Sequence, residues 1–168
     1  MRPLVDTVIE DARWQAFGLP GLSDHAARAA LSHLGLDPEG FQIVLMGCND
    51  ARIAALNGDF RAKPRPTNVL SWPSEERAAA EEGGTPDLPQ PGSVDAPEEL
   101  GDIAIAWETC AAEAEAAQKP MQDHVTHLVV HATLHLLGYD HIREGDAQLM
   151  QGLETRILAS LGLDDPYS

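Results

Sequence analysis

The stretch HVTHLVVHATLHLLGYDH, residues 124–141, constrains the fold of this chain more than any other. Its apolar residues recur at helical spacing and Gly138 ends the pattern, so we expect a helix over residues 121–137. One face of that helix is apolar, as a buried face would be. The other face carries four histidines within an arc of about 80°, and a fifth follows the glycine. Histidines in such register indicate a binding site, and they are His124, His127, His131, His135 and, after the glycine, His141.

The spacing of these histidines indicates which of them could share a metal ion. Residues four apart lie one helical turn, about 6 Å, apart along the axis, so His131 could pair with either His127 or His135. Gly138 can adopt a positive φ that ends the helix and reverses the chain. This reversal would return His141 to the last turn, near His135 and roughly 12 Å from His127. The predicted ligands are therefore His131, His135 and His141.

Three protein ligands of this kind are typical of a catalytic zinc site, whereas structural zinc sites usually have four. Neutral imidazoles would leave the full charge on the ion, and the fourth position would bind water and lower its pKa to about 7. One Zn²⁺ per chain is the expected cofactor, although three imidazoles also accept nickel or copper. Asp140 could serve as a base or orient a ligand histidine. His127 and His124 are expected behind the ligands or on the substrate side, and purely structural roles fit them equally well.

The frame H-x-x-x-H-x-x-G-x-x-H resembles that of the metzincin metalloproteases. Those proteases carry a glutamate after the first histidine as general base, where this chain has Ala132. Peptide cleavage needs that base, whereas a phosphodiester brings its own negative charge to the metal. The substitution therefore favours phosphoryl chemistry, and a base from elsewhere in the chain would leave peptide cleavage open.

Several other segments have the patterns of regular secondary structure. Four read as strands, at residues 3–10, 41–47, 67–72 and 102–107. Four more read as helices, at residues 23–35 with Ser23 as N-cap, 49–58, 108–119 and 144–162. We therefore expect an α+β fold, with a single mixed sheet of about four strands, helices packed against it and a metzincin-like histidine helix.

The length of 168 residues and the hydrophobic content of 43% suit a single domain over residues 1–168 with its own core. The first residues mix acids with apolar side chains, unlike a signal peptide, and no apolar run approaches the roughly 18 residues of a membrane span. Cys48 and Cys110 have no metal-like spacing and are expected to be buried thiols. These features predict a cytoplasmic protein with no membrane partner.

Charge is distributed unevenly along the chain. The net charge of −16 argues against indiscriminate binding of nucleic acid. Residues 75–102 contain nine acidic residues and a single basic residue, Arg77. The proline- and glycine-rich stretch at about 74–100 is expected to be a surface insertion. A short basic patch at Arg61, Lys63 and Arg65 contrasts with this acidic body.

Three blocks of the sequence together resemble the YbeY family of bacterial zinc-dependent endoribonucleases. They are LNGDFRAKPRPTNVLSWP, LGDIAI and HVTHLVVHATLHLLGYDH, in the expected order over residues 56–141. The resemblance implies zinc on His131, His135 and His141, a functional Arg61, and a role in ribosome biogenesis through maturation of the 3′ end of 16S ribosomal RNA. Two features depart from it: Ala132 stands where the family usually has glycine, and the 74–100 stretch is longer than the pattern requires.

The basic patch gains a chemical role beside this motif. Arg61 would contact a phosphate through two hydrogen bonds and stabilise the charge of a phosphoryl-transfer transition state. Lys63 and Arg65 would hold flanking phosphates of single-stranded RNA. Thr67 and Asn68 could contact the substrate backbone or simply begin a strand. The acidic surface would repel bulk RNA, which favours ribosomal RNA presented in the small subunit and makes ribosomal proteins candidate partners.

Two other functions fit the same motif. A metzincin-like metalloprotease would need a carboxylate near the metal. A non-catalytic ribosome-assembly factor would hold zinc structurally, which requires a fourth protein ligand and predicts unfolding on chelation.

Overall fold

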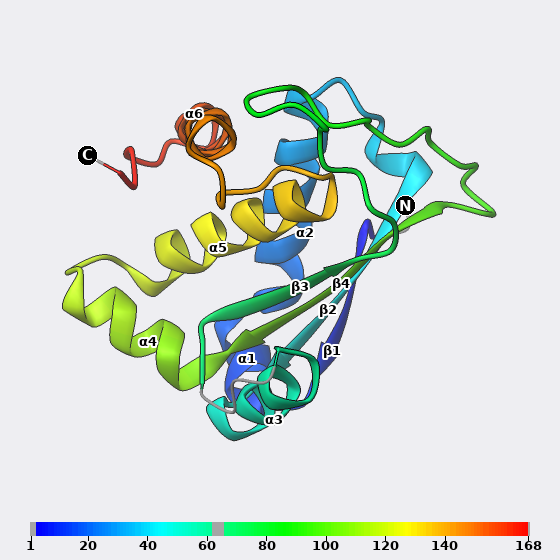
Figure 1. The fold of residues 1–168 in the computed structure, drawn as a ribbon. Coiled ribbons are helices and arrows are strands. Elements are labelled where there is room, and N and C mark those ends of the chain that lie inside the picture. The colour runs from blue at the N-terminus through cyan, green and yellow to red at the C-terminus, as the bar shows by residue number, and fades with distance from the viewer. Residues whose placement is uncertain (1–2, 62–65, 168) are drawn as a thin grey trace.

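The computed structural model describes residues 3–61 and 66–167 (Figure 1). Within them four strands form one sheet: β1 (Val5–Ile9), β2 (Phe41–Cys48), β3 (Val69–Pro73) and β4 (Glu98–Ala106). The helices of the first half are α1 (Ala12–Phe17), α2 (Leu19–His33) and α3 (Asp50–Arg61), with a 3-10 turn at Pro38–Gly40. Those of the second half are α4 (Trp107–Ala116), α5 (Met121–Leu136) and α6 (Glu144–Ser160).

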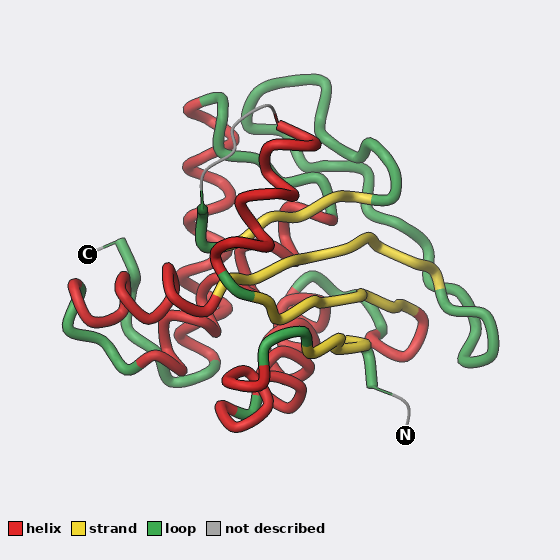
Figure 2. The backbone as a smooth tube through the Cα atoms, turned by 90° about the horizontal axis from the view of Figure 1, so that it is seen from below, coloured by secondary structure: helices red, strands yellow, loops and turns green. Residues whose placement is uncertain are grey.

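The sheet has the strand order β1-β2-β4-β3. β1, β2 and β4 run parallel, and β3 pairs antiparallel with β4 at the edge. Figure 2 shows the strands side by side, with β1, which follows the N-terminus, at the opposite edge. This arrangement confirms the predicted α+β fold with a single mixed sheet of four strands and helices packed on it.

Side chains along β2 alternate between two cores, as the period of two requires. Ile43 and Leu45 point into the larger core, which α2, α5 and α6 complete. Cys48 points to the other face, where it meets Ile53 of α3 in a smaller core. Each fully buried aliphatic side chain of this kind contributes roughly 2 kcal/mol to folding. The two faces are therefore covered unequally, with α3 on one and most of the helices on the other (Figure 1).

The histidine helix α5 occupies the middle of the larger helical layer. It contacts α2, α4 and α6 as well as β3. Val125, Val129 and Leu136 are fully or almost fully buried, which confirms the predicted apolar face. The helix ends where expected, because Gly138 has φ +106, a conformation that side-chain-bearing residues rarely adopt.

Several helix and strand bounds differ from the sequence prediction. α1 was not expected, and α2 begins at Leu19, so Ser23 lies inside the helix and not at its cap; its Oγ donates to the carbonyl of Pro20. α3 continues past Gly58 to Arg61. β4 begins at Glu98, four residues early, because it pairs with β2 from Phe41 onward. For β4, pairing with β2 outweighs the local signal.

Residues 74–97 contain no helix or strand. No helix in the described part of the chain is long and apolar enough to cross a membrane.

Candidate metal centre and substrate pocket

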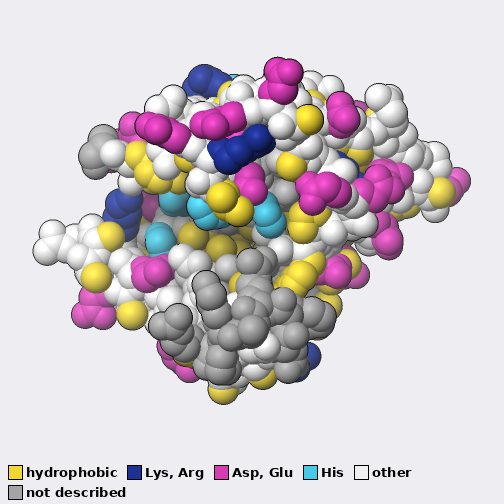
Figure 3. Space-filling view, viewed as in Figure 1, with side chains coloured by type: hydrophobic (Ala, Val, Ile, Leu, Met, Phe, Trp, Pro, Cys, Tyr) yellow, Lys and Arg dark blue, Asp and Glu magenta, His cyan; other side chains and the backbone are white. Residues whose placement is uncertain are grey.

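A pocket of about 350 Å³ opens between the C-terminal half of α5 and the edge strand β3. His131, His135 and His141 all line it. Figure 3 shows histidine side chains gathered in a hollow, with acidic side chains on the surface around it. The remaining lining residues are Asn57, Thr67, Val69, Leu70, Ser71, Asp140 and Ile142. The three histidines predicted to share a metal ion therefore meet at one cavity.

His135 is oriented by the strand beside it. Its Nδ1 atom lies 2.5 Å from Oγ of Ser71, a residue 64 positions earlier in the sequence. When Nδ1–H donates to that hydroxyl, the lone pair of the imidazole is on Nε2, which is the tautomer that a metal ligand needs. The contact exists because β3 packs directly on α5.

His131 is oriented from the other side, by α6. Its Nδ1 atom lies 3.1 Å from Oε2 of Glu154, whose side chain is only 1% exposed. Oε1 of the same carboxylate lies 2.6 Å from Nε2 of His127 and accepts a 2.7 Å hydrogen bond from the hydroxyl of Tyr167. One buried carboxylate thus connects two histidines of α5 with the C-terminal segment of the chain.

Burial alone would raise the pKa of the Glu154 carboxyl, because a charge is costly away from water. Hydrogen bonds from His127, His131 and Tyr167 outweigh that effect and lower the pKa to about 2. Burial of the Tyr167 hydroxyl and its hydrogen bond to this carboxylate raise the pKa of Tyr167. Glu154 is therefore ionised at neutral pH and can only accept hydrogen bonds.

The spacing of His131 and His141 fits a shared metal ion. Their ring centroids lie 5.4 Å apart. Two imidazoles bound to one tetrahedral zinc have ring centres roughly 5 Å apart, given zinc–nitrogen bonds near 2.1 Å. Among residues 3–61 and 66–167, however, no three His, Cys, Asp or Glu side chains already form a complete metal-binding group. The His141 side chain is 60% exposed, so few packing contacts fix its orientation.

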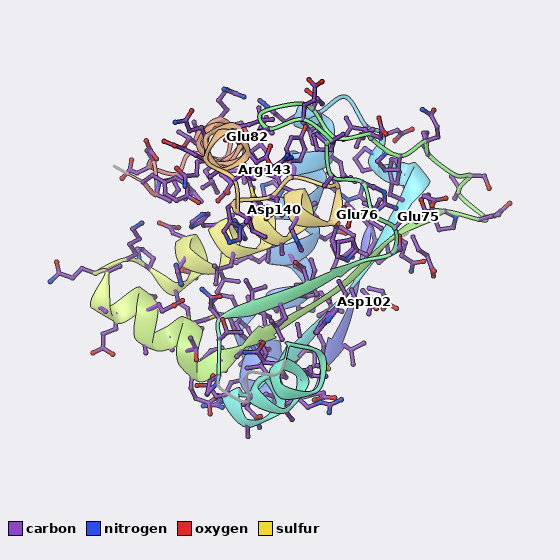
Figure 4. The ribbon with its side chains drawn as sticks, in the orientation of Figure 1. Glu75, Glu76, Glu82, Asp102, Asp140 and Arg143 are labelled. Carbon is purple, nitrogen blue, oxygen red and sulfur yellow. The ribbon has the colours of Figure 1, made fainter. Side chains whose placement is uncertain are left out.

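Asp140 lines the pocket and fixes the turn that carries His141. Its Oδ1 accepts a 2.7 Å hydrogen bond from the backbone N–H of His141 and lies 3.9 Å from Nδ1 of that ring. This turn is braced by the acidic segment that precedes β4, because Arg143 donates to the carbonyls of Ala79 and Ala80. Figure 4 shows Asp140 and Arg143 on the connection between α5 and α6, with Glu82 nearby.

The residues predicted to bind substrate do not all line the pocket. Thr67 lines the pocket, whereas Asn68 does not, and the Asn68 amide donates a 3.0 Å hydrogen bond to Glu113 of α4. Arg61 is the last residue of α3, one turn after Asn57 of the pocket wall. The predictions for the Arg61 side chain, Lys63 and Arg65 lie outside the described residues.

His124, on the same face of α5, lies outside the pocket. Nε2 of His124 lies 2.9 Å from Oε1 of Glu113, so it connects α5 to α4 and does not line the pocket. His127 reaches His131 through the Glu154 carboxylate and does not line the pocket.

Sequence reasoning missed two residues that orient the histidines, Ser71 and Glu154. A signal for Glu154 was present, because it is a charged residue within the apolar stripe of α6 formed by Met150, Leu153, Ile157 and Leu158. Ser71 gave none, since a serine in a strand is ordinary and only its packing against α5 singles it out.

The comparisons with known proteins show the family and the fold of the chain. Residues 9–162 match the family model described as endoribonuclease YbeY. The solution structure of a protein from Thermotoga maritima has the same fold, with a TM-score of 0.56 over 98% of this chain and 99% of that one, at 16% identity.

Similar chains carry the name endoribonuclease YbeY. The protein of Ruegeria pomeroyi is 61% identical, with 98% of each chain covered. That of Cereibacter sphaeroides is also 61% identical, over 99% of this chain and all of the relative. A family model that spans nearly the whole chain, together with relatives this similar, establishes that the chain belongs to the YbeY family of endoribonucleases.

Proposed function

We propose that this protein is a metal-dependent endoribonuclease that cleaves single-stranded RNA, with one zinc ion held by His131, His135 and His141. The observation that carries the proposal is the meeting of these three side chains at one 350 Å³ pocket. Hydrogen bonds at Nδ1 of His131 and His135 would direct their Nε2 atoms to a shared ligand. The family supports the reaction class, since the relatives are named endoribonucleases.

A bound zinc ion would supply a Lewis acid and a water ligand with a pKa near 7. The chain would supply the positioning of substrate around it. Thr67 and Asn57 on the pocket wall carry side chains that can donate hydrogen bonds to phosphate oxygens. Arg61 would neutralise charge that accumulates on the phosphate during cleavage, with Lys63 and Arg65 holding neighbouring phosphates of the strand. Asn68 would act indirectly, by holding the start of β3 against α4.

Asp140 is the carboxylate that lines the pocket together with the histidines. Its Oδ1 is already used by the backbone of His141, so we assign it to orienting that residue. Its second oxygen would remain available to accept a proton from the attacking group. His127 stabilises the arrangement through Glu154.

The substrate we propose is ribosomal RNA of the small subunit, acted on in the cytoplasm during maturation of its 3′ end. The net charge of −16 supports this choice, because it would weaken the binding of free RNA and leave recognition to the basic patch or to ribosomal protein partners. Cleavage of a given RNA sequence should therefore be more efficient within the small subunit than in the free molecule. Equal efficiency on both would contradict this part of the proposal.

The central test combines metal analysis with RNA cleavage by the purified protein. We expect about one zinc per chain and cleavage of a single-stranded oligonucleotide. Arg61→Ala should cut at least roughly 100-fold more slowly while retaining zinc. His135→Ala should lose both zinc and cleavage. Arg52→Ala is the matched control, because this arginine is exposed in α3, pairs with Glu10 and should cut normally.

Three outcomes would overturn the proposal. Zinc-loaded protein that digests casein but not RNA would be a protease. Protein that unfolds on chelation and never cuts RNA would hold zinc structurally. Full cleavage by His135→Ala would place the reaction elsewhere in the molecule. The product ends then distinguish the nucleophile, because a 2′,3′-cyclic phosphate requires attack by the neighbouring 2′-hydroxyl.

A further inference from the structure

Glu154 is the least exposed charged side chain in contact with the histidine helix. It belongs to α6, its side chain is 1% exposed, and no part of it lines the pocket. A buried carboxylate is destabilising unless its oxygens are well paired, so its retention calls for a reason. Its partners are His131 of the pocket, His127 of the same helix and Tyr167.

We propose that Glu154 is a positioning residue of the metal centre, which holds His131 in its metal-binding tautomer, and that Tyr167 of the C-terminal segment holds Glu154. This inference rests on the proposed function, in that His131 is taken as a metal ligand. It extends the site from the pocket to Tyr167, 13 positions after Glu154 in the C-terminal segment.

The argument begins with the two nitrogens of His131. Nδ1 is 3.1 Å from Oε2 of Glu154. An ionised carboxylate only accepts hydrogen bonds, so a neutral His131 must carry its proton on Nδ1. Nε2 then carries the lone pair that metal binding requires, and the ring cannot turn over without losing its partner. Metal-ligating histidines commonly have a carboxylate in this position.

Tyr167 completes the arrangement. Its hydroxyl donates a 2.7 Å hydrogen bond to Oε1 and lies 3.3 Å from Nε2 of His127. Its ring meets that of His127 edge to face, with centroids 5.6 Å apart. The backbone N–H of Tyr167 donates to Asp165, whose carboxylate also accepts from Thr155 of α6. The C-terminal segment is thus fastened to α6 beside the carboxylate and satisfies an oxygen that would otherwise depend on His127 alone.

A glutamine at position 154 separates this role from simple packing. Glu154→Gln keeps the shape but has one acceptor oxygen and one NH₂ donor. It cannot accept from both His127 and His131, so one ring must change tautomer or lose its partner. Tyr167→Phe removes only the hydroxyl. Glu144→Gln is the matched control, because it makes the same change at an exposed position of the same helix.

The experiment measures zinc affinity by competition with a chromophoric chelator, and the tautomer of each histidine by long-range ¹H–¹⁵N NMR of the metal-free protein at pH 8. The His131 signal is identified by its loss in His131→Gln. For the wild type we expect a proton on Nδ1 of His131. Glu154→Gln should weaken zinc binding roughly 10- to 100-fold and populate the Nε2–H form. Tyr167→Phe should weaken it by a smaller factor, and Glu144→Gln should leave both measurements unchanged.

Either of two results would overturn the inference: a wild-type His131 with its proton on Nε2, or a folded Glu154→Gln with the zinc affinity of Glu144→Gln. If Glu154→Gln does not fold, the inference is tested by the tautomer of His131 in the wild type and by the zinc affinity of Tyr167→Phe. The measurement of the tautomer requires neither zinc nor RNA. A protein that binds no zinc would therefore contradict the proposed function, while the spectrum would still show whether Glu154 orients the ring.

Discussion

The guanidinium of Arg77 donates a 2.8 Å hydrogen bond to the carbonyl oxygen of Leu136, the last residue of the histidine helix. Arg77 is only 5% exposed and also donates to the hydroxyl of Ser74. A cation at the C-terminal end of a helix is stabilised by the unpaired carbonyls there. The single arginine of the acidic stretch therefore anchors that stretch to the end of the helix that carries His131 and His135.

Replacing Arg77 should be among the costly single changes in the chain. Arg77→Leu would leave the carbonyl of Leu136 without this donor in a buried position, and we expect the free energy of unfolding to fall by about 2–4 kcal/mol. Urea denaturation of the metal-free protein measures it. Arg52→Leu, which removes an exposed ion pair with Glu10, should cost less than about 1 kcal/mol. Equal losses for the two variants would mean that Arg77 does not anchor the helix end.

The turn after α5 should tolerate no side chain at Gly138. Its φ of +106 is unfavourable for alanine, and an added Cβ would lie 2.6 Å from the carbonyl oxygen of Arg77. Gly138→Ala should therefore lower the melting temperature, with a loss of at least about 1 kcal/mol. Gly21→Ala, inside α2 with nothing within 4 Å, should be neutral or stabilising. A stable Gly138→Ala protein would show that the turn can rearrange.

Ser71 lines the pocket and should affect metal binding through His135. Ser71→Ala removes the hydroxyl beside Nδ1, a partner that favours the metal-binding tautomer of His135. We expect the zinc dissociation constant to rise roughly 10-fold. Chelator competition measures it, and Ser93→Ala in the acidic stretch serves as the control, since Ser93 bonds only locally to Ala96. No change in Ser71→Ala would remove this serine from the site.

Stability should depend on pH through Glu154. The pKa of this carboxyl is about 2 in the folded protein against an ordinary value of 4.5. Because the folded value is lower, its contribution is fully present above about pH 4.5 and is lost as the pH falls toward 2. The stability difference between wild type and Glu154→Gln should shrink by up to about 3 kcal/mol over that range. Urea denaturation of metal-free protein at several pH values would reveal a constant difference if Glu154 were not strongly paired.

Much of the fold followed from local patterns. The apolar, β-rich run at residues 41–47 and the alternation along residues 102–107 predicted strands of the sheet, and both exist as parts of β2 and β4. Local patterns were less reliable for the ends of the helices. Ser23 looks like a helix cap but lies inside α2, and Gly58 looks like a helix end but α3 continues for three more residues.

For the site, the sequence by itself determined the row of histidines on one helical face and the turn at Gly138, because both depend on residues within a few turns of one another. Only the tertiary structure decided which groups orient those histidines. Ser71 and Glu154 lie 64 and 23 residues from their histidines, and the contacts exist because β3 and α6 pack on opposite sides of α5. Periodicity reports which side chains share a face of a helix, whereas the partner opposite each one is set by how separate elements pack together.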